Sequence, residues 1–462
     1  MIHVPSMVAR RHMAGLSLIE MMIALIMALI VAAGIITVFA STSSSNKVQQ
    51  QMAALQEEGR FAIHSLRNDL ANANGTYCSN SGGNAMDTGS TGGSGLYLDA
   101  LRSPTVYAKT AIAFTDNTVA LPVPGGAYSL PSSVFMRGYE CTTSSCTPNG
   151  LAGLVASGIP AMDTAVDSRV KGADVLTIRY LKPGAGWAIV PSGGSIPGTT
   201  LDAPASATSS ATVTDINLVP MTGEPAVNTF TGTLAMLADC SNAQVFTVSG
   251  AGGATLTPNN NYAPPLDIST GAAPRLFDFT NDFQTVTYYL KVVCADGSSP
   301  CAHTTGALIR RVNGQENVAG AGELVRGVER LDFRYGIIDA NGNTQFLTAD
   351  QVDTRNGGAI PCPPGNPTNL MLDPDSSSPP QEKGCLWRAV QTIEVHILMD
   401  GQTPLYTLTP NEMAYIYTPD SASATPIAPT AHTIQPNADQ GFPNPLLRRE
   451  FTTLVALRNF NP

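Results

Sequence analysis

Residues 16–40 read LSLIEMMIALIMALIVAAGIITVFA, an almost uninterrupted apolar run. As an α-helix rising ~1.5 Å per residue, this run is long enough to cross a hydrocarbon layer of ~30 Å. Arg10 and Arg11 precede the run, and no acidic residue does. Because segments rich in Lys and Arg remain in the cytoplasm, we expect residues 16–40 to span a membrane and the rest of the chain to be exported.

One carboxylate, Glu20, interrupts this apolar run. An acidic side chain at a bilayer centre costs roughly 2.5–3.5 kcal/mol, so such a residue is expected to be functional and to have a partner. Glu20 is the fifth residue counted from Leu16. Cleavage between Gly15 and Leu16 would create an α-ammonium about one helical turn from the carboxylate. A Glu20 that simply lies at the membrane interface is the alternative.

The helical pattern continues through residues 41–75, after a serine-rich joint at Ser41–Ser45. Apolar residues recur every three or four positions, as on a helix with one buried face: Val48, Met52, Leu55, Gly59, Ala62, Leu66 and Ala73, widened by Phe61, Ile63 and Leu70. The opposite face, which we expect to be in water, carries Gln49, Gln56, Glu57, Arg60, His64, Arg67 and Asp69. Gly34 and the serine-rich joint are expected weak points, since Gly and Ser lower helix propensity.

Residues 76–462 are expected to form a β-rich head with long loops. Apolar and polar residues alternate over 176–180, 286–292, 331–337 and 393–399, as in half-buried strands. No second long helical pattern intervenes, which favours antiparallel sheets, and Asn341-Gly342 predicts a hairpin. Stretches rich in Pro, Gly, Ser and Thr are interpreted as long surface loops: 183–233, 252–275, 355–384 and 418–445. The predicted class is α+β.

All eight cysteines follow residue 77, which fits disulfide bonds in an oxidising compartment. Cys141–Cys146, Cys294–Cys301 and Cys362–Cys385 would each close a local loop, leaving Cys78–Cys240 to join the end of the long helix to the sheet. Eight cysteines allow 105 pairings, so the sequence leaves the connectivity open. A zinc site is the alternative, but no C-x-x-C occurs and only His303 lies near a cysteine.

Charge and motif content argue against several function classes. The formal net charge is −10 and charged residues make up 13% of the chain, which does not suit a nucleic-acid binder that relies on a basic surface. The sequence lacks G-x-S-x-G, H-E-x-x-H and a Walker loop. We therefore expect no enzymatic activity, no cofactor and no metal site.

The N-terminus resembles a type IV prepilin (class III) signal: a short basic leader ending in Gly15, then Leu16-Ser17-Leu18-Ile19-Glu20 and a long apolar helix. The resemblance implies that a prepilin peptidase cuts after Gly15 and methylates Leu16. It also implies that Glu20 pairs with the terminal amine of a neighbouring subunit. Leu16 departs from the phenylalanine usual at this position.

Several head segments resemble the PilW-type minor pilins: 172–180, Asp239-Cys240 before Val245-Phe246, 307–311, 325–335 and 448–459. The resemblance implies a pilin-like fold with a leader (1–15), a membrane or filament-core helix (16–40), its amphipathic second half (41–75) and a head (76–462). It implies a low-copy minor pilin in the tip or priming complex, which supports motility and adhesion. The expected partners are other minor pilins, the major pilin, a tip adhesin, the prepilin peptidase and the inner-membrane assembly platform.

Three alternatives stay open. Val38-Phe39-Ala40 could serve as a cleavage site for an ordinary secretory signal, although the apolar run is longer than such signals require. A J-like minor pseudopilin of a type II secretion system would share the same N-terminus. A single-pass surface protein that binds a ligand through its long loops would keep residues 1–15.

Overall fold

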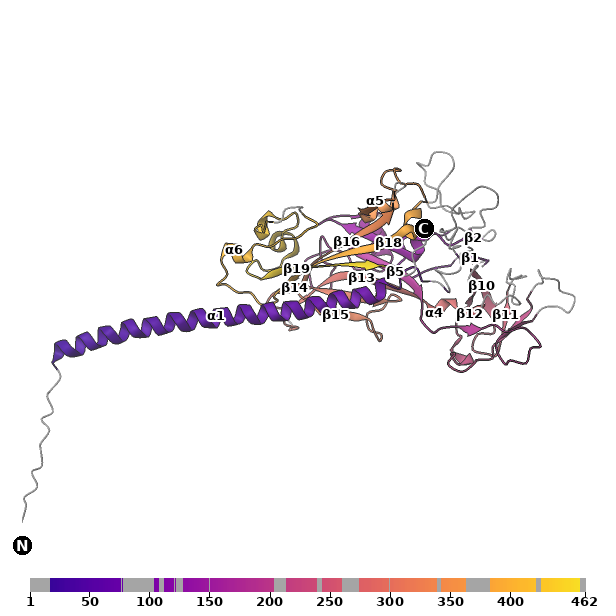
Figure 1. Ribbon diagram of the computed structural model, residues 1–462, viewed down its shortest axis with the longest axis horizontal. Helices are drawn as coiled ribbons and strands as arrows, with labels where there is room; N and C mark the ends of the chain where they lie inside the picture. Colours follow the sequence, from indigo (N-terminus) through magenta and orange to yellow (C-terminus); the bar gives the residue numbers. More distant parts are fainter. Residues whose placement is uncertain are drawn as a thin grey trace, which may run out of the picture. The chain divides into compact units, whose positions relative to one another are not determined.

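The computed structural model of the chain describes residues 17–75, 77, 104–107, 112–119, 121, 128–148, 150–202, 213–238, 243–259, 274–298, 300–338, 342–362, 383–420 and 425–457. The chain forms two compact units, Met1–Ala54 and Leu55–Pro462. One helix runs through the boundary between them (Figure 1).

Helix α1 spans Leu18–Leu70. It begins where the backbone N–H groups of Glu20 and Met21 donate to the carbonyl oxygen of Ser17, at 3.0 and 3.1 Å. The helix continues through Gly34 and Ser41–Ser45 without a break, so these weak helix formers do not interrupt it. In the described part of the chain, α1 alone is long and apolar enough to cross a membrane, judged by length and composition; the mean hydropathy of its most apolar window is 2.8.

The second unit contains a six-stranded antiparallel sheet in the order β15-β14-β13-β5-β3-β4. Its strands are β3 (Met136–Cys141), β4 (Cys146–Thr147), β5 (Val175–Leu181), β13 (Phe283–Cys294), β14 (Thr304–Val312) and β15 (Gly322–Arg326). The predicted strands over 176–180 and 286–292 are present as β5 and β13, and they pair antiparallel, with Val286 opposite Ile178. Their inward residues form much of the core.

A four-stranded antiparallel sheet, in the order β17-β16-β18-β19, comes from the C-terminal part of the chain. It consists of β16 (Val328–Ile338), β17 (Thr344–Leu347), β18 (Val390–Asp400) and β19 (Arg448–Ala456). The predicted strands over 331–337 and 393–399 lie within β16 and β18. β16 and β17 pair as a hairpin, with Ile338 opposite Thr344; Asn341, the first residue of the predicted turn, lies outside the described residues.

A third sheet is built from strands inserted between β5 and β13, together with two short strands from residues 105–129. It comprises β1 (Thr105–Val106), β2 (Tyr128–Ser129), β6 (Trp187–Ala188), β7 (Thr200–Asp202), β8 (Asp215–Asn217), β9 (Leu234–Ala238), β10 (Ala243–Ser249), β11 (Thr255–Pro258) and β12 (Arg275–Asp278). All pairs are antiparallel except β1 with β10. The interpretation of 183–233 and 252–275 as surface loops was therefore wrong in part, because they contribute β6, β7, β8, β11 and the first residue of β12.

These inserted strands have their own core. Trp187, Phe230 and Phe246 are at most 1% exposed and pack with the apolar residues of β7, β8 and β11. The strands are only two to seven residues long, too short to show a clear alternation among many Pro, Gly and Ser residues. Long-range packing of a few large apolar side chains thus overrides a composition typical of loops.

Short helical segments lie between the strands. They are α2 (Ser132–Phe135), α3 (Gly150–Ala156), α4 (Phe279–Asp282), α5 (Ala349–Asp353), α6 (Pro410–Met413), η1 (Val227–Thr229), η3 (Cys385–Ala389), η4 (Pro429–Ala431) and η5 (Pro436–Gln440). α5 and α6 each begin with a capping box, Thr348 with Gln351 and Thr409 with Glu412. The chain therefore combines an N-terminal apolar helix with an antiparallel β-rich body, and its class is α+β.

Candidate functional site

The candidate processing and assembly residues lie at the start of α1. Glu20 is exposed in the first turn of the helix, between Ile19 and Met21, which are 66% and 60% exposed. Gly15 and Leu16 lie outside the described residues. The structure thus places the Glu20 carboxylate on an apolar helix surface, near the end where a cleaved chain would begin.

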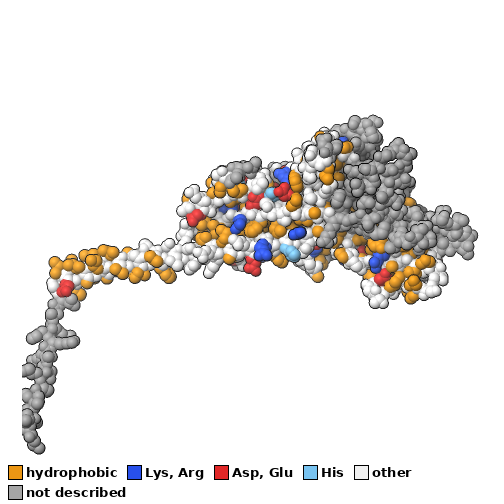
Figure 2. Space-filling model, in the orientation of Figure 1, with side chains coloured by type: hydrophobic (Ala, Val, Ile, Leu, Met, Phe, Trp, Pro, Cys, Tyr) orange, Lys and Arg blue, Asp and Glu red, His pale blue; other side chains and the backbone are white. Residues whose placement is uncertain are grey.

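The first half of α1 exposes an unusual amount of apolar surface (Figure 2). A set of large apolar side chains is 53–79% exposed: Leu18, Ile19, Met21, Met22, Ile23, Leu25, Ile26, Met27, Leu29, Ile30, Val31, Ile35, Ile36, Val38 and Phe39. Soluble monomers rarely expose a continuous apolar patch larger than a few hundred Å². This surface therefore fits a helix that is covered by lipid or by other protein helices.

The polar groups of this segment are compatible with such surroundings. The hydroxyl of Thr37 donates to the carbonyl oxygens of Ala33 and Gly34, at 3.1 and 2.8 Å. Within a membrane, backbone and hydroxyl groups must find partners inside the protein. Glu20 is the one ionisable residue between Ser17 and Ala40. Its carboxylate is therefore the one charged group of this segment that needs a polar partner.

The second half of α1 is docked by Asp69. Arg310 Nε of β14 lies 2.6 Å from Asp69 Oδ2, and the hydroxyl of Tyr288 in β13 donates to the same oxygen at 2.6 Å. The hydroxyl of Tyr180 in β5 donates to Asp69 Oδ1 at 3.2 Å. The side chains of Asp69 and Arg310 are only 15% and 16% exposed. The prediction that Asp69 faces water was therefore wrong, because three neighbouring strands present donors to it.

This carboxylate changes the acidity of its donors. Burial, and then the negative charge of Asp69, raises the pKa of Tyr180 to about 12 and that of Tyr288 well above its usual value. Burial alone would lower the pKa of Arg310, but the hydrogen bond to Asp69 and its charge raise it. The tyrosines therefore stay protonated and Arg310 charged, so all three donate to Asp69 at any physiological pH.

Two further contacts hold the same helix segment. A Cβ built on Gly59 would lie 2.5 Å from the ring of Phe451 in β19, so only glycine allows this close approach. The Nε2 of Gln402 donates to Glu58 Oε2 at 2.8 Å, and burial raises the pKa of Glu58. Leu55, Gly59, Ala62, Leu66 and Leu70 are buried as the stripe predicted, whereas Phe61 is 51% exposed, contrary to that pattern.

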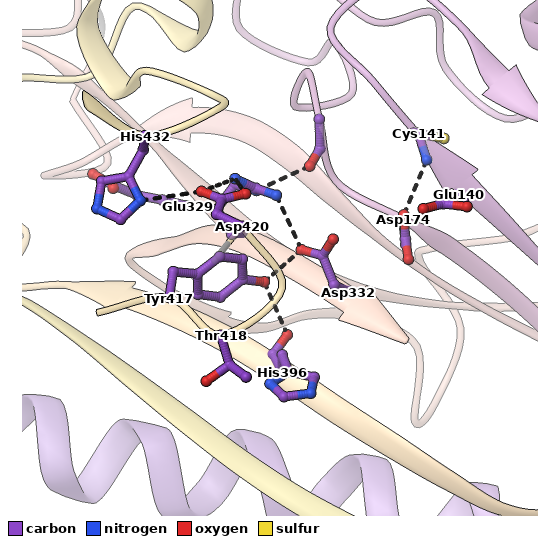
Figure 3. A network of polar contacts seen from close by, with 12 residues as sticks. Glu140, Cys141, Asp174, Glu329, Asp332, His396, Tyr417, Thr418, Asp420 and His432 are labelled. Carbon is purple, nitrogen blue, oxygen red and sulfur yellow. Dashed lines mark hydrogen bonds and ion pairs between the residues drawn. The ribbon is translucent and has the colours of Figure 1, made fainter. Parts of the chain in front are cut away.

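Arg330 of β16 is the centre of a polar network with the C-terminal loop, the connection between β18 and β19. Figure 3 shows its partners Asp332, Tyr417 and Asp420. Its guanidinium donates to Asp420 at 3.1 Å and to Asp332 at 3.3 Å, and it lies 4.7 Å from the ring centroid of Tyr417. Burial would raise the pKa of Asp420, but the hydrogen bond from His432 and the charge of Arg330 hold it below its usual value. Arg330 thus fixes a loop that has little regular structure of its own.

A second buried pair lies beside this network. Glu329 and Arg448 have no exposed side-chain surface and meet through two contacts, at 2.6 and 2.9 Å. The same guanidinium donates to the carbonyl oxygens of Pro443 and Asn444. Both residues belong to segments that carried the head resemblance, 325–335 and 448–459. Their role in the structure is to hold β16, β19 and the C-terminal loop together.

Three disulfide bonds are present among the described residues: Cys141–Cys146, Cys294–Cys301 and Cys362–Cys385. These are the three local pairs considered from the sequence. Cys78 and Cys240 lie outside the described residues. Within the described ranges, no cluster of three or more His, Cys, Asp or Glu side chains could hold a metal ion.

The sequence patterns did not predict the residues that attach the helix to the sheets, above all Asp69, Tyr288 and Arg310. One sequence signal was available: Arg310 lies on a largely apolar face of its strand, and a buried cation needs a carboxylate. The structure shows that Arg310 is the direct cross-strand partner of Tyr288 on the six-stranded sheet. Without the pairing of β13 with β14, however, nothing in the sequence links residues 69 and 310.

Comparison with known proteins supports a pilus-related assignment. Residues 287–459 match the family described as Type IV Pilus-assembly protein W, PilW, which confirms the PilW resemblance over that part of the chain. A solved type IV-like pilin from Thermus thermophilus is similar at 17% sequence identity. The matched region covers 38% of this chain and 80% of the pilin chain. Its TM-score is 0.16, and we draw no structural conclusion from it. No curated protein matches the sequence.

Proposed function

We propose that this type IV pilus-related protein is a minor pilin, cleaved after Gly15 and inserted into the pilus through α1. The observation that carries the proposal is the joint occurrence of a PilW match over residues 287–459 and an apolar helix that is exposed over residues 18–39. In this account residues 1–15 are the leader, residues 16–40 the membrane and filament-core segment, residues 41–75 the second half of the helix, and residues 76–462 the exported head.

Assembly follows from the surface of α1. While the helix is in the membrane, lipid covers its exposed apolar side chains, and in the filament the helices of neighbouring subunits replace the lipid. Glu20 then selects the register by meeting the terminal ammonium of an adjoining subunit. At ~4 Å and an effective dielectric constant of ~20, that attraction is about 4 kcal/mol before desolvation.

The docking of α1 on the head serves the same function. Asp69 attaches the helix to the six-stranded sheet, Gly59 to β19 of the four-stranded sheet, and Glu58 to the segment that follows β18. A force applied to the filament is therefore passed from the helix into the head through several contacts. The size of the second unit, Leu55–Pro462, favours a low-copy subunit at the tip or in the priming complex over repeated packing along the filament.

The first test is mass spectrometry of the mature N-terminus. We expect the mature chain to begin at Leu16, with an added methyl group on its amine. A chain that begins at Met1 or Ser41 would overturn the processing step, and with it the role of Glu20. A chain that begins at an unmethylated Leu16 would retain cleavage but remove methylation from the proposal.

The second test addresses Glu20. Glu20→Val is expected to leave membrane insertion and cleavage intact but to reduce pilus number severalfold, because the ammonium of the neighbouring subunit loses its partner. Glu57→Gln, which changes an exposed carboxylate on the same helix, is the matched control and should leave piliation unchanged. Normal piliation with Glu20→Val would contradict the pairing role.

The proposed partners are the other minor pilins, the major pilin, a tip adhesin, the prepilin peptidase and the inner-membrane assembly platform. Crosslinking from a cysteine introduced near Glu20 should capture pilin subunits. Capture of secretion-system components in place of pilins would favour the J-like pseudopilin alternative. The PilW match favours a pilus over a secretion system as the assembly that this chain joins.

A further inference from the structure

The disulfide Cys141–Cys146 differs from Cys294–Cys301 in the described contacts of its sulfur atoms. It joins the ends of β3 and β4, where the two cysteines are direct cross-strand partners. Arg169 Nη1 lies 3.2 Å from Cys141 Sγ and 3.6 Å from Cys146 Sγ, and Arg169 Nη2 lies 3.5 Å from Cys146 Sγ. A guanidinium thus donates to both sulfurs.

This guanidinium is poorly compensated. Arg169 is 0% exposed, and its one further described side-chain hydrogen bond goes from Nε to the carbonyl oxygen of Pro160, at 3.3 Å. Around it lies an apolar cluster that includes Leu154, Ile159 and Val293. Burial lowers the pKa of Arg169 to about 10, so the group remains charged at neutral pH. A neutral disulfide cannot balance that charge, whereas a thiolate could.

Asp174, whose charge partly opposes the lowering of the Arg169 pKa, makes its hydrogen bonds to backbone groups. Asp174 accepts hydrogen bonds from the backbone N–H groups of Cys141 and Phe333, both at 3.0 Å; Figure 3 shows the contact with Cys141. Burial raises the pKa of Asp174 well above its usual value, although these hydrogen bonds oppose the shift. Cys141 therefore sits between a buried cation at its sulfur and a buried carboxyl at its backbone.

We propose that Cys141–Cys146 is a thiol–disulfide exchange site, at which an external dithiol reduces and re-forms the bond more readily than it does at Cys294–Cys301. A thiolate of the dithiol attacks Cys141 Sγ, the more exposed residue of the pair at 6% against 1%. The S–S bond breaks and Cys146 leaves as a thiolate facing Arg169. The second thiol of the dithiol, as its thiolate, then attacks the mixed disulfide, which releases Cys141. The external dithiol has become a disulfide, and the protein pair has gained two electrons.

Arg169 assists this exchange because a neighbouring cation lowers the pKa of a leaving thiol and stabilises the reduced form. Access is through the tight turn between the cysteines. The backbone of that turn is closed by Thr142 N–H to the carbonyl oxygen of Ser145, at 2.8 Å, and Thr142, Ser144 and Ser145 are exposed. The turn therefore places the disulfide at the surface end of the β3–β4 pair.

Cys294–Cys301 provides an internal control in the same molecule. There Arg326 Nη1 donates to the backbone carbonyl oxygen of Cys294, at 2.8 Å, and not to a sulfur. A cation is thus close to both disulfides, but only at Cys141–Cys146 do the described contacts direct it at the atoms that would carry the negative charge.

The test equilibrates the full chain, in detergent, with graded ratios of reduced to oxidised dithiothreitol. Acid quenching, alkylation and mass spectrometry then give the reduced fraction of each pair. We expect Cys141–Cys146 to be half-reduced at a ratio of reduced to oxidised dithiothreitol at least tenfold lower than that for Cys294–Cys301. This corresponds to a difference in reduction potential of about 30 mV for a two-electron couple. Arg169→Met should reduce that gap to less than threefold, Arg169→Lys should retain part of it, and Arg326→Met should leave the Cys141–Cys146 midpoint unchanged.

Equal midpoints in the wild-type chain, or an undiminished gap in Arg169→Met, would overturn the proposal. If circular dichroism shows that Arg169→Met does not fold, the pH profile of iodoacetamide reaction with the reduced wild-type chain decides instead. Cys146 should then react with its half-maximal rate at a lower pH than Cys294 and Cys301. A half-maximal rate at the same pH would reject the role of Arg169.

Discussion

The two halves of α1 share one continuous helix but differ in what their apolar faces contact. From Leu18 to Phe39, large apolar side chains are exposed around the helix, as with Leu25, Ile30 and Phe39 at 62–74%. From Leu55 onward, a narrow stripe is buried against the sheets and Asp69 is bound by side chains from three strands. The apolar side chains of the first half therefore need partners outside the chain, whereas those of the second half are already covered by the sheets.

The charges follow the same division. In the first half, Glu20 is a carboxylate with no ion pair recorded among the described residues, and an intermolecular ammonium is its proposed partner. In the second half, Asp69 has an intramolecular cation, Arg310, at 2.6 Å. Asp69 attaches the helix to the head, and Glu20 has a role in assembly only under the function proposed above. The following predictions test this division, from the largest expected effect to the smallest.

Replacing Asp69 should produce the largest loss of stability. Asp69→Asn leaves Arg310 partly buried without its carboxylate, which we expect to lower the free energy of unfolding by about 3 kcal/mol. Glu57→Gln, the same change at an exposed position of the helix, should cost less than about 0.5 kcal/mol. Urea unfolding followed by near-ultraviolet circular dichroism measures both. Equal midpoints for the two variants would show that Asp69 does not anchor the helix.

Two glycines of α1 provide a matched pair for the packing difference. A Cβ on Gly59 would clash with the Phe451 ring, whereas a Cβ on Gly34 would meet nothing within 4 Å. Gly59→Val should therefore destabilise the second unit by about 1–3 kcal/mol through overpacking. Gly34→Val should leave its thermal unfolding unchanged. If Gly59→Val also leaves the unfolding temperature unchanged, the contact of the helix with β19 is not tight.

The head should also show a pH dependence. His396 hydrogen bonds to Glu450 at 2.8 Å and lies 3.5 Å from Glu394. Burial alone would lower its pKa, but these carboxylates raise it above the usual value. The stabilisation is therefore complete below the unfolded pKa of about 6.5 and is lost as pH rises through the higher folded pKa.

His396→Gln tests this dependence in the same head. Loss of a charge-assisted hydrogen bond should cost about 1.5 kcal/mol at pH 6 and less at pH 8.5. Urea unfolding of both proteins at the two pH values gives the difference. A cost for His396→Gln that is the same at pH 6 and pH 8.5 would contradict a charged imidazole at this site.

Removing the first half of the helix should have the smallest effect on the head. A chain that begins at Leu55 retains the buried stripe and all contacts of Asp69, so its unfolding temperature should stay within about 3 °C of that of the full chain. It should also remain soluble without detergent, because the exposed apolar surface is gone. A large drop in unfolding temperature would mean that residues before Leu55 support the head.

Much of this organisation is predictable from local sequence. The apolar run of residues 16–40, the later stripe and the alternating segments predicted α1, β5, β13, β16 and β18, because each pattern reflects a local period of 3.6 or 2 residues. The three described disulfides join cysteines that are near in sequence. The inserted strands β6 to β8 escaped prediction because they are short and lie in a stretch of loop-like composition.

The sequence alone determined that the chain has a membrane-length helix, a lone acid within it and a β-rich head, because hydropathy and periodicity are properties of neighbouring residues. Only the tertiary structure decided that Asp69 is an anchor, that Glu329 and Arg448 form a buried pair, and that Arg169 faces two sulfur atoms. These contacts join residues 241, 119, 28 and 23 positions apart. A polar residue becomes buried only when distant strands close over it, and no local pattern records that event.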